Sequence, residues 1–152
     1  MSGIIGFYPC TIDEKGRIKL PAALIKGLPE EAEGRFVVNK GFEKCLMLYP
    51  ENEWQKIDAK LSKVNTFITK NRDFVRFFKS AVTTLVPDAS DRILLPKILT
   101  DHASIKKDIV LVPMQDGWEI WDQNTYNIYM QSKSSDDYAG LAEEVMGGSP
   151  HE

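Results

Sequence analysis

The sequence predicts an α+β fold, mostly β with helices, in which two tandem copies of one small unit pack together and helices follow each repeat. The motif Asp-x3-Arg-Ile-x-Leu-Pro occurs at residues 13–21 and returns at residues 88–96, 75 positions later. A second similarity follows it, because residues 44–50 align with residues 116–122, 72 positions apart. The chain has 152 residues, of which 43% are hydrophobic. A unit of half that length can hardly bury a core alone, so the copies are expected to form one pseudo-symmetric pair.

The first copy begins with β structure. Residues 7–12 are β-prone but contain Pro9, which predicts a short edge strand. Residues 13–16 predict a turn that an Asp opens and in which Gly16 supplies a positive φ. Residues 17–20 alternate between charged and apolar side chains, which predicts a strand with one buried face.

A short helix and a β-hairpin complete this copy. Pro21 is expected to begin a helix over residues 22–26, and Gly27 to end it. Residues 35–39 and 45–49 are rich in β-prone residues and are separated by a turn, so they are expected to pair as adjacent strands.

The longest helical segment is predicted over residues 51–79, divided near Asn65-Thr66. Its aromatic residues, with Trp118 and Trp121, are interpreted as core and subunit interface rather than as platforms for stacked bases. Its exposed positions are mostly basic: Lys56, Lys60, Lys63, Lys70, Arg72, Arg76 and Lys79. The first three share one helix face, which suits solvent, a DNA backbone or an acidic neighbour.

The second copy repeats this order. Strands are expected over residues 81–86, 92–95, 108–112 and 118–121, and helices over residues 96–102, 124–133 and 137–146. Ile93-Leu94-Leu95 lacks the alternation of the first copy, which predicts a strand buried on both faces. The domain division expected from these elements is a first unit over 4–54, a helical linker over 55–79, a second unit over 80–126, and a C-terminal helix with a flexible tail over 127–152.

Charge and composition exclude several classes of protein. The net charge is −3, but residues 1–79 carry 14 Lys+Arg against 10 Asp+Glu, whereas residues 80–152 carry 5 against 12. This asymmetry indicates a local basic surface on an acidic remainder. Neither a membrane span nor a secretory signal is expected. Cys10 and Cys45 are expected to be reduced, and two Cys with two distant His predict neither a metal site nor a cofactor.

These motifs resemble a known family. Residues 13–21, 45–50 with Trp54, 71–78, 92–96 and 118–122 resemble the swapped-hairpin fold of AbrB-type transition-state regulators, and the doubled arrangement resembles the MraZ family. The resemblance covers roughly residues 4–130. It implies two tandem swapped-hairpin units that form a pseudo-two-fold β-barrel.

For function, the resemblance implies a cytoplasmic, nucleoid-associated DNA-binding transcriptional regulator with no enzymatic activity. Such a protein is expected to repress the division and cell-wall gene cluster, its own promoter included. It is expected to bind tandem repeats in double-stranded DNA as a homo-oligomeric ring. In that family the Asp-x3-Arg motif contacts DNA, which corresponds here to Asp13 and Arg17, and to Asp88 and Arg92.

The first motif suits contact with DNA. Arg17 can donate two hydrogen bonds to a guanine edge or clamp a phosphate. Lys15 and Lys19 are expected beside it, where they neutralise phosphates. Asp13 cannot touch a phosphate favourably, so it is expected to brace Arg17 or to cap the turn. The alternative is that Asp13 and Gly16 merely build a turn and Arg17 is solvated.

The second motif departs from the first. Asp91 stands where Gly16 stands, and no lysine flanks Arg92. Two acids in this loop should repel phosphate, so Arg92 either contacts DNA or pairs with Asp88 or Asp91 and serves the fold or a subunit contact. DNA recognition is therefore expected to be led by the first half.

Two other functions are alternatives to a DNA-binding regulator. A protein-interaction module of antitoxin type would use the same fold without reading DNA, but it does not need the cluster of Lys15, Arg17 and Lys19. An enzyme would need convergent acid, base or nucleophile groups, and the sequence offers no such cluster.

Overall fold

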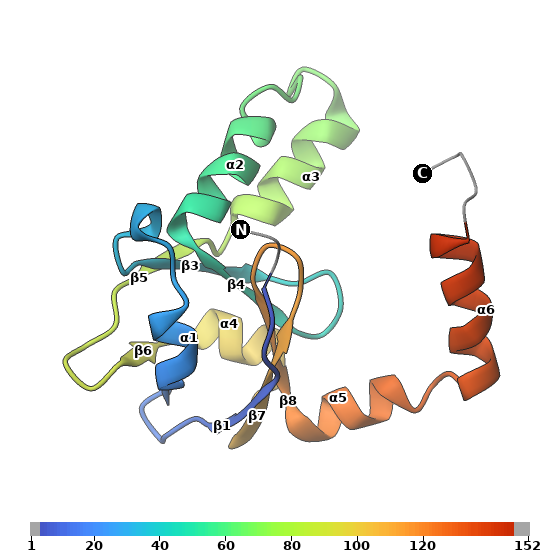
Figure 1. Ribbon diagram of the computed structural model, residues 1–152. Helices are drawn as coiled ribbons and strands as arrows, with labels where there is room; N and C mark the ends of the chain where they lie inside the picture. The colour runs from blue at the N-terminus through green and yellow to red at the C-terminus, as the bar shows by residue number, and fades with distance from the viewer. Residues whose placement is uncertain (1–3, 148–152) are drawn as a thin grey trace.

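The computed structural model describes residues 4–147 as an antiparallel α+β fold whose two halves exchange strands (Figure 1). Each half contributes four strands in the same chain order. The strands are β1 (Tyr8–Thr11), β2 (Arg17–Lys19), β3 (Phe36–Lys40), β4 (Leu46–Pro50), β5 (Thr83–Leu85), β6 (Arg92–Leu94), β7 (Asp108–Pro113) and β8 (Trp118–Asp122).

The pairing of these strands shows the exchange. Six of them form one antiparallel sheet in the order β1-β7-β8-β4-β3-β5, and β2 pairs with β6 in a second, two-stranded sheet. The first strand of the first half therefore pairs with the second half, since β1 lies on β7. In the same way β5, the first strand of the second half, lies on β3 of the first. The predicted pseudo-symmetric pair is confirmed by these matching exchanges.

The sheet is open rather than closed. In the described residues β1 and β5 each have one neighbour in the large sheet, and an isolated bridge from Ile12 to Ile18 links the end of β1 to β2. The β-barrel implied by the resemblance is therefore not closed between residues 4 and 147. Pro9 removes an N–H from β1, and β5 has only three residues, so neither edge offers a long row of donors.

The helices follow the predicted order. They are α1 (Ala22–Lys26), α2 (Glu51–Leu61), α3 (Thr69–Lys79), α4 (Lys97–His102), α5 (Gln123–Met130) and α6 (Ser135–Met146). The division of the long segment is wider than predicted, since residues 62–68 separate α2 from α3. None of the helices in residues 4–147 is long and apolar enough to cross a membrane. The flexible tail predicted over residues 147–152 lies, apart from Gly147, outside the described residues.

One element was not predicted. A short 3-10 helix, η1 (Glu30–Ala32), lies between α1 and β3, and Glu33 ends it in a left-handed conformation with φ 53°. The corresponding connection after α4 is shorter. This difference explains why the repeat spacing falls from 75 to 72 positions along the chain.

The main core is built by both halves together. Ile18 of β2 and Ile93 of β6 face each other in the register and are fully buried. Leu24 of α1 and Leu99 of α4 cover them as a second symmetric pair. Because each pair takes one residue from each half, neither half encloses this core alone.

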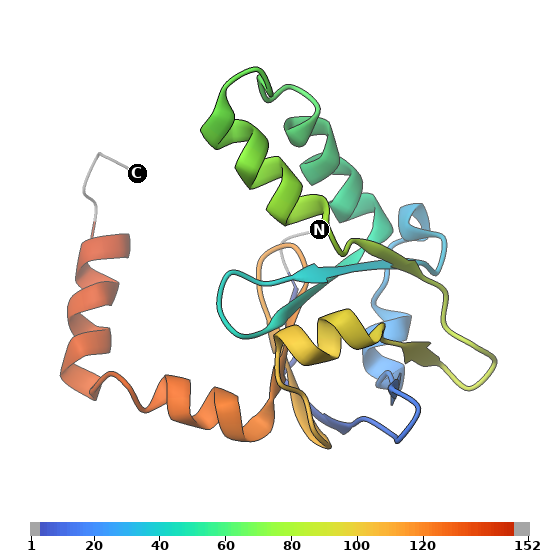
Figure 2. The same ribbon diagram turned by 180° about the vertical axis from the view of Figure 1, so that it is seen from behind.

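The helices outside the core stand in two groups. The hairpin of α2 and α3 packs on the sheet through Trp54 and Phe78, which join a cluster with Val37 and Tyr49 (Figures 1 and 2). After β8, α5 and α6 extend as an arm away from the body (Figures 1 and 2). Of this arm, α5 contacts β7 and β8.

Candidate nucleic-acid interface

The two Asp-x3-Arg motifs meet on one small ribbon. Strands β2 and β6 pair antiparallel, so Arg17 lies opposite Leu94 and Lys19 lies opposite Arg92. The central pair, Ile18 and Ile93, points into the core. The other four side chains therefore share the outward face, which we call the ribbon face (Arg17, Lys19, Arg92 and Leu94).

The prediction for residues 93–95 was wrong. Leu94 is 55% exposed, whereas Ile93 and Leu95 are buried. The strand alternates in the same way as the first copy, because Leu94 occupies the position equivalent to Lys19. Because Leu94 is apolar like its two neighbours, the sequence itself shows no alternation between buried and exposed positions.

The first loop is fixed by Asp13. Its Oδ1 accepts the backbone N–H groups of Lys15 and Arg17, both at 2.9 Å. Its Oδ2 accepts the Nε–H of Arg17 at 2.7 Å. Gly16 closes the turn with φ 88° and donates its N–H to the Asp13 carbonyl at 3.0 Å. Asp13 therefore caps the turn and also braces Arg17, the two roles proposed for it from the sequence.

The hydrogen bonds of this loop favour the ionised form of Asp13. Hydrogen bonding from Arg17, first from its backbone N–H and then from its guanidinium, lowers the pKa of Asp13 despite some desolvation. Asp13 binds only the Nε–H of the guanidinium. Within residues 4–147 the two terminal nitrogens of Arg17 have no protein acceptor, which leaves four N–H donors at the loop for a ligand.

The second loop has the same geometry. Oδ1 of Asp88 accepts the N–H groups of Ser90 at 2.8 Å and Arg92 at 2.9 Å, and Oδ2 accepts the Arg92 Nε–H at 2.9 Å. Backbone hydrogen bonding from Arg92 is the first cause of a lowered pKa at Asp88. Asp91 adopts φ 61°, the left-handed conformation that Gly16 supplies in the first loop.

This equivalence changes how the second motif is interpreted. The pairing of Arg92 with Asp88 was expected as an alternative to DNA contact, and it is present. Arg17 pairs with Asp13 in the same way, so the pairing does not distinguish the two loops. What differs is the charge around them, because Ser90 replaces the equivalent Lys15.

The two loops are also joined to each other. The Leu20 N–H donates to the Asp91 carbonyl at 2.8 Å, and the Leu95 N–H donates to the Gly16 carbonyl at 2.9 Å. In Figure 1 both loops lie on the side of the molecule away from the α5–α6 arm. Motifs 75 residues apart therefore form one continuous surface.

The ribbon face carries a charge arrangement that suits an anion. Lys19 and Arg92 are direct cross-strand partners, and Arg17 is the next residue but one on β2. Like charges directly opposite in a sheet are destabilising. A polyanion lying on the ribbon face removes this cost, because it places negative charge between the cations.

Sequence reasoning missed a neighbouring pair of lysines. The Ile12 N–H, at the start of the first loop, donates to the carbonyl of Lys107 at 2.8 Å. Lys107 is exposed, and Lys106 precedes it. The adjacent lysines are a visible signal, but only the pairing of β1 with β7 places them beside the first loop.

The basic residues of α2 and α3 are partly paired within the chain. Lys56 binds Glu53 at 3.1 Å, Arg76 binds Asp73 at 2.9 Å, and Lys79 lies 3.4 Å from Asp58. These exposed pairs suit a solvated helix surface. None of these pairs holds a cation in the way that Asp13 holds Arg17 in the first loop.

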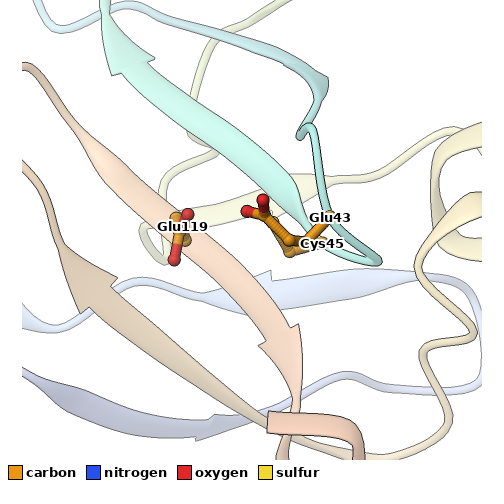
Figure 3. A group of neighbouring side chains, drawn as sticks. All are labelled: Glu43, Cys45 and Glu119. Atoms are coloured by element: carbon orange, nitrogen blue, oxygen red, sulfur yellow. The ribbon is translucent and has the colours of Figure 1, made fainter. Parts of the chain in front are cut away.

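A group of possible metal ligands lies elsewhere, between β4 and β8. Figure 3 shows Glu119 on β8 facing Cys45 and Glu43, and one ligand atom from each lies within 4.8 Å of the others. Burial, followed by the nearby Glu119 and Glu43, raises the pKa of the Cys45 thiol to about 12. Glu119 accepts the Trp121 indole N–H at 2.9 Å. Metal ligation needs a thiolate, so this group fits a structural contact better than a metal site.

Comparison with known proteins agrees with the doubled architecture. The family described as "MraZ protein, putative antitoxin-like" matches residues 4–77 and again residues 78–146. A protein of Christiangramia forsetii named "Transcriptional regulator MraZ" is 43% identical over 97% of this chain and 95% of its own length. Proteins of the same name from Cytophaga hutchinsonii and Desulfitobacterium hafniense are each 39% identical, over 93% of this chain and 93% and 96% of their own lengths. The resemblance inferred from the doubled motif is thus confirmed, and the chain belongs to the MraZ family of transcriptional regulators, with two tandem family domains.

Proposed function

We propose that this protein is a sequence-specific regulator that binds double-stranded DNA through the ribbon face and the two loops. The observation that carries the proposal is the position of Lys19 opposite Arg92, with Arg17 on the same face. The similarity to transcriptional regulators implies DNA binding, and a non-enzymatic role. The ribbon supplies a specific surface for it.

Within this surface, the residues have different roles. The two terminal nitrogens of Arg17 are directed at a guanine edge or a phosphate, while Asp13 holds the guanidinium through its Nε–H. Lys15 and Lys19 neutralise phosphates beside it. A two-stranded ribbon fits the width of the major groove.

The second loop contributes less. Asp88 holds Arg92 in the same geometry, and Arg92 adds positive charge opposite Lys19. Asp91 places an acid in the same loop. The proposal therefore keeps all six residues, Asp13, Lys15, Arg17, Lys19, Asp88 and Arg92, and gives the leading role to the first loop.

The wider assignment follows the resemblance. We propose that the protein acts as a repressor in the cytoplasm, on the nucleoid, at the promoter of the division and cell-wall gene cluster that includes its own gene. A homo-oligomeric ring presents several ribbon faces to tandem DNA repeats, so that weak single contacts combine into tight binding. The proposal also keeps the division of the chain into two units, a helical linker and a C-terminal segment, with boundaries after residues 54, 79 and 126.

The experiment compares two DNA duplexes by fluorescence anisotropy. One carries the region upstream of the protein's own gene, and the other is a shuffled duplex of equal length and composition. We expect tighter binding to the first, and a steep loss of affinity as salt rises, because counterions are released on binding.

The outcome also decides the alternative. Equal binding to both duplexes contradicts sequence-specific recognition. Absence of binding to either duplex contradicts the proposal and favours a protein-interaction module of antitoxin type.

A further inference from the structure

The first loop has a basic neighbour that the second loop lacks. Lys106 and Lys107, which we call the lysine pair, immediately precede β7 and are exposed. The start of β7 lies beside the end of β1, since Asp108 is opposite Thr11 in the register. Figures 1 and 2 both show the start of β7 next to the first loop. The lysine pair therefore borders the loop that carries Arg17.

Backbone contacts connect the lysine pair to the ribbon. The Ile12 N–H donates to the Lys107 carbonyl at 2.8 Å, and Ile12 forms a bridge to Ile18 of β2. Neighbouring strands lie about 4.8 Å apart, so the backbone of Lys107 is about 10 Å from β2. The major groove is about 12 Å wide. A ribbon lying in the groove therefore brings the lysine pair to the phosphates along one of its edges.

The backbone of the lysine pair is fixed, whereas its side chains are free. Asp122, which is 5% exposed, accepts the Lys106 N–H at 3.1 Å, and the Lys107 carbonyl is held from the first loop. Among residues 4–147 neither ammonium of the pair forms an ion pair, whereas Lys56 and Lys79 each do. This arrangement suits an anionic ligand, because binding it costs only side-chain freedom.

The pseudo-symmetry identifies the corresponding residues of the first half. Phe36 of β3 and Ile109 of β7 occupy equivalent positions, because their partners on β5 and β1 are 75 positions apart. Residues 33–35 therefore correspond to residues 106–108. Residues 106–108 are two lysines and the exposed Asp108, so a net charge of +1 remains beside the first loop.

Residues 33–35 give the second loop no comparable neighbour. Arg35 is the one basic residue among them, and its guanidinium binds the carboxylates of Glu33 and Glu51. Pro87 stands at the position that holds a donating N–H in the first copy, so the hydrogen bond to the preceding strand is lost as well. The asymmetry of the two loops therefore continues into the residues around them.

We propose that the lysine pair binds the sugar-phosphate backbone of the DNA that the first loop contacts, so that the DNA-binding surface extends from the ribbon face over the start of β7. The inference rests on the proposed function and deepens it by adding Lys106 and Lys107 to the binding residues. Phosphate contacts fix the position and orientation of a protein on the duplex. Because one half alone carries the pair, this contact gives a pseudo-symmetric ribbon one preferred direction on DNA.

The test measures how DNA binding by full-length variants depends on salt, by fluorescence anisotropy. The double variant Lys106→Gln with Lys107→Gln loses two phosphate contacts, so its salt slope should be smaller by about 1.8. The ratio of wild-type to variant affinity should then fall about 12-fold between 50 and 200 mM salt. The loss should be equal for the upstream and the shuffled duplex, because a phosphate contact does not read the sequence.

Two matched variants control for charge and for structure. Lys60→Gln with Lys63→Gln removes two exposed lysines at the far end of α2, which lies away from the first loop in Figure 1, so the salt slope should not change. Lys106→Arg with Lys107→Arg keeps both charges and should bind as wild type does. Circular dichroism checks that each variant folds.

Hydroxyl-radical footprinting on the upstream duplex locates the contact. The variant without the lysine pair should lose protection at one end of each protected segment and keep it at the other. An unchanged salt slope, a slope reduced equally by the α2 control variant, or protection lost equally at both ends would overturn the inference.

Failure of this inference differs from failure of the proposed function. A wild type that binds DNA, loses binding in Arg17→Ala and is unaffected by loss of the lysine pair keeps the proposed function and refutes the inference. A wild type that binds no DNA refutes both.

Discussion

The asymmetry between the two loops gives the most direct prediction. Arg17→Ala and Arg92→Ala remove the same side chain from loops with the same backbone geometry. In each variant the Asp still accepts two backbone N–H groups, so the turn should persist. Any difference in DNA binding between the variants then reports the chemistry around each arginine and not the loop conformation.

The expected magnitude follows from the donors that each arginine offers. A bidentate contact to a base is worth roughly 1–3 kcal/mol, so Arg17→Ala should lower affinity for the specific duplex by roughly 5- to 150-fold. Arg92 has Ser90 and Leu94 at the positions equivalent to Lys15 and Lys19. We therefore expect Arg92→Ala to lower affinity for the specific duplex by less than about tenfold, which corresponds to a loss of less than about 1.4 kcal/mol in binding free energy.

The assay is fluorescence anisotropy with the upstream duplex at several salt concentrations. Arg17→Lys is the matched control, because it keeps the charge but not the planar fork of donors. If Arg17 reads a base, Arg17→Lys should lose discrimination between specific and shuffled duplexes. If Arg17 clamps a phosphate, Arg17→Lys should bind almost as wild type does, and Arg17→Ala should reduce the salt slope by about 0.9. Equal losses in Arg17→Ala and Arg92→Ala would refute the argument that the first loop leads.

Four further outcomes are expected. Leu94→Lys restores the cation found at the equivalent position of the first copy, so it should strengthen DNA binding and steepen the salt slope by about 0.9, as anisotropy can show. Ile18→Ala removes a fully buried side chain shared by both halves, and urea unfolding should show a loss of about 2–5 kcal/mol in a single transition; two separate transitions would contradict a shared core. The pKa of Asp13 is lowered in the folded protein, so its contribution to stability is present above about pH 4 and is lost as the pH falls through the folded pKa. Asp13→Asn should remove that acid dependence from urea unfolding measured across the acid range. Burial raises the pKa of Glu119, so stability from its protonated form is lost as the pH rises through the folded pKa, and Glu119→Gln should raise the neutral-pH melting temperature.

The elements of the fold could largely be predicted from the sequence because they depend on local signals. Helix α1 begins after Pro21 and ends before Gly27, as expected. The doubled motif predicted two copies of one unit. The resemblance implied interlocked, swapped-hairpin units, but the particular partners of β1 and β5 were not predicted, because strand partners depend on contacts between residues far apart in the chain. The short helix η1 was also missed, although the change in repeat spacing marks where the copies differ.

The candidate site was predictable in part for the same reason. The roles of Asp13 as cap and brace follow from residue chemistry within five positions, and the structure confirms both. The exposure of Leu94 was missed because its own side chain is apolar. Its alignment with the charged Lys19 of the first copy is what indicates an exposed position. The proximity of Lys107 to the first loop depends on the exchanged strand and has no local signal.

The symmetry of the scaffold explains why the motif is present twice even if only one copy contacts DNA. Asp88 and Arg92 make the same contacts in their loop that Asp13 and Arg17 make in theirs, including the backbone N–H of each Asp, which donates to the carbonyl of its Arg. The Asp of this pattern builds each loop and holds the Arg in the same geometry, so the presence of the pattern in the second copy is no argument for DNA contact there. We expect any difference in DNA affinity between the two loops to come from positions that the loop does not need, where lysine in the first copy is replaced by Ser90 and Leu94 in the second. A second loop given those lysines should bind DNA as the first does, because the scaffold already holds its arginine in the same geometry.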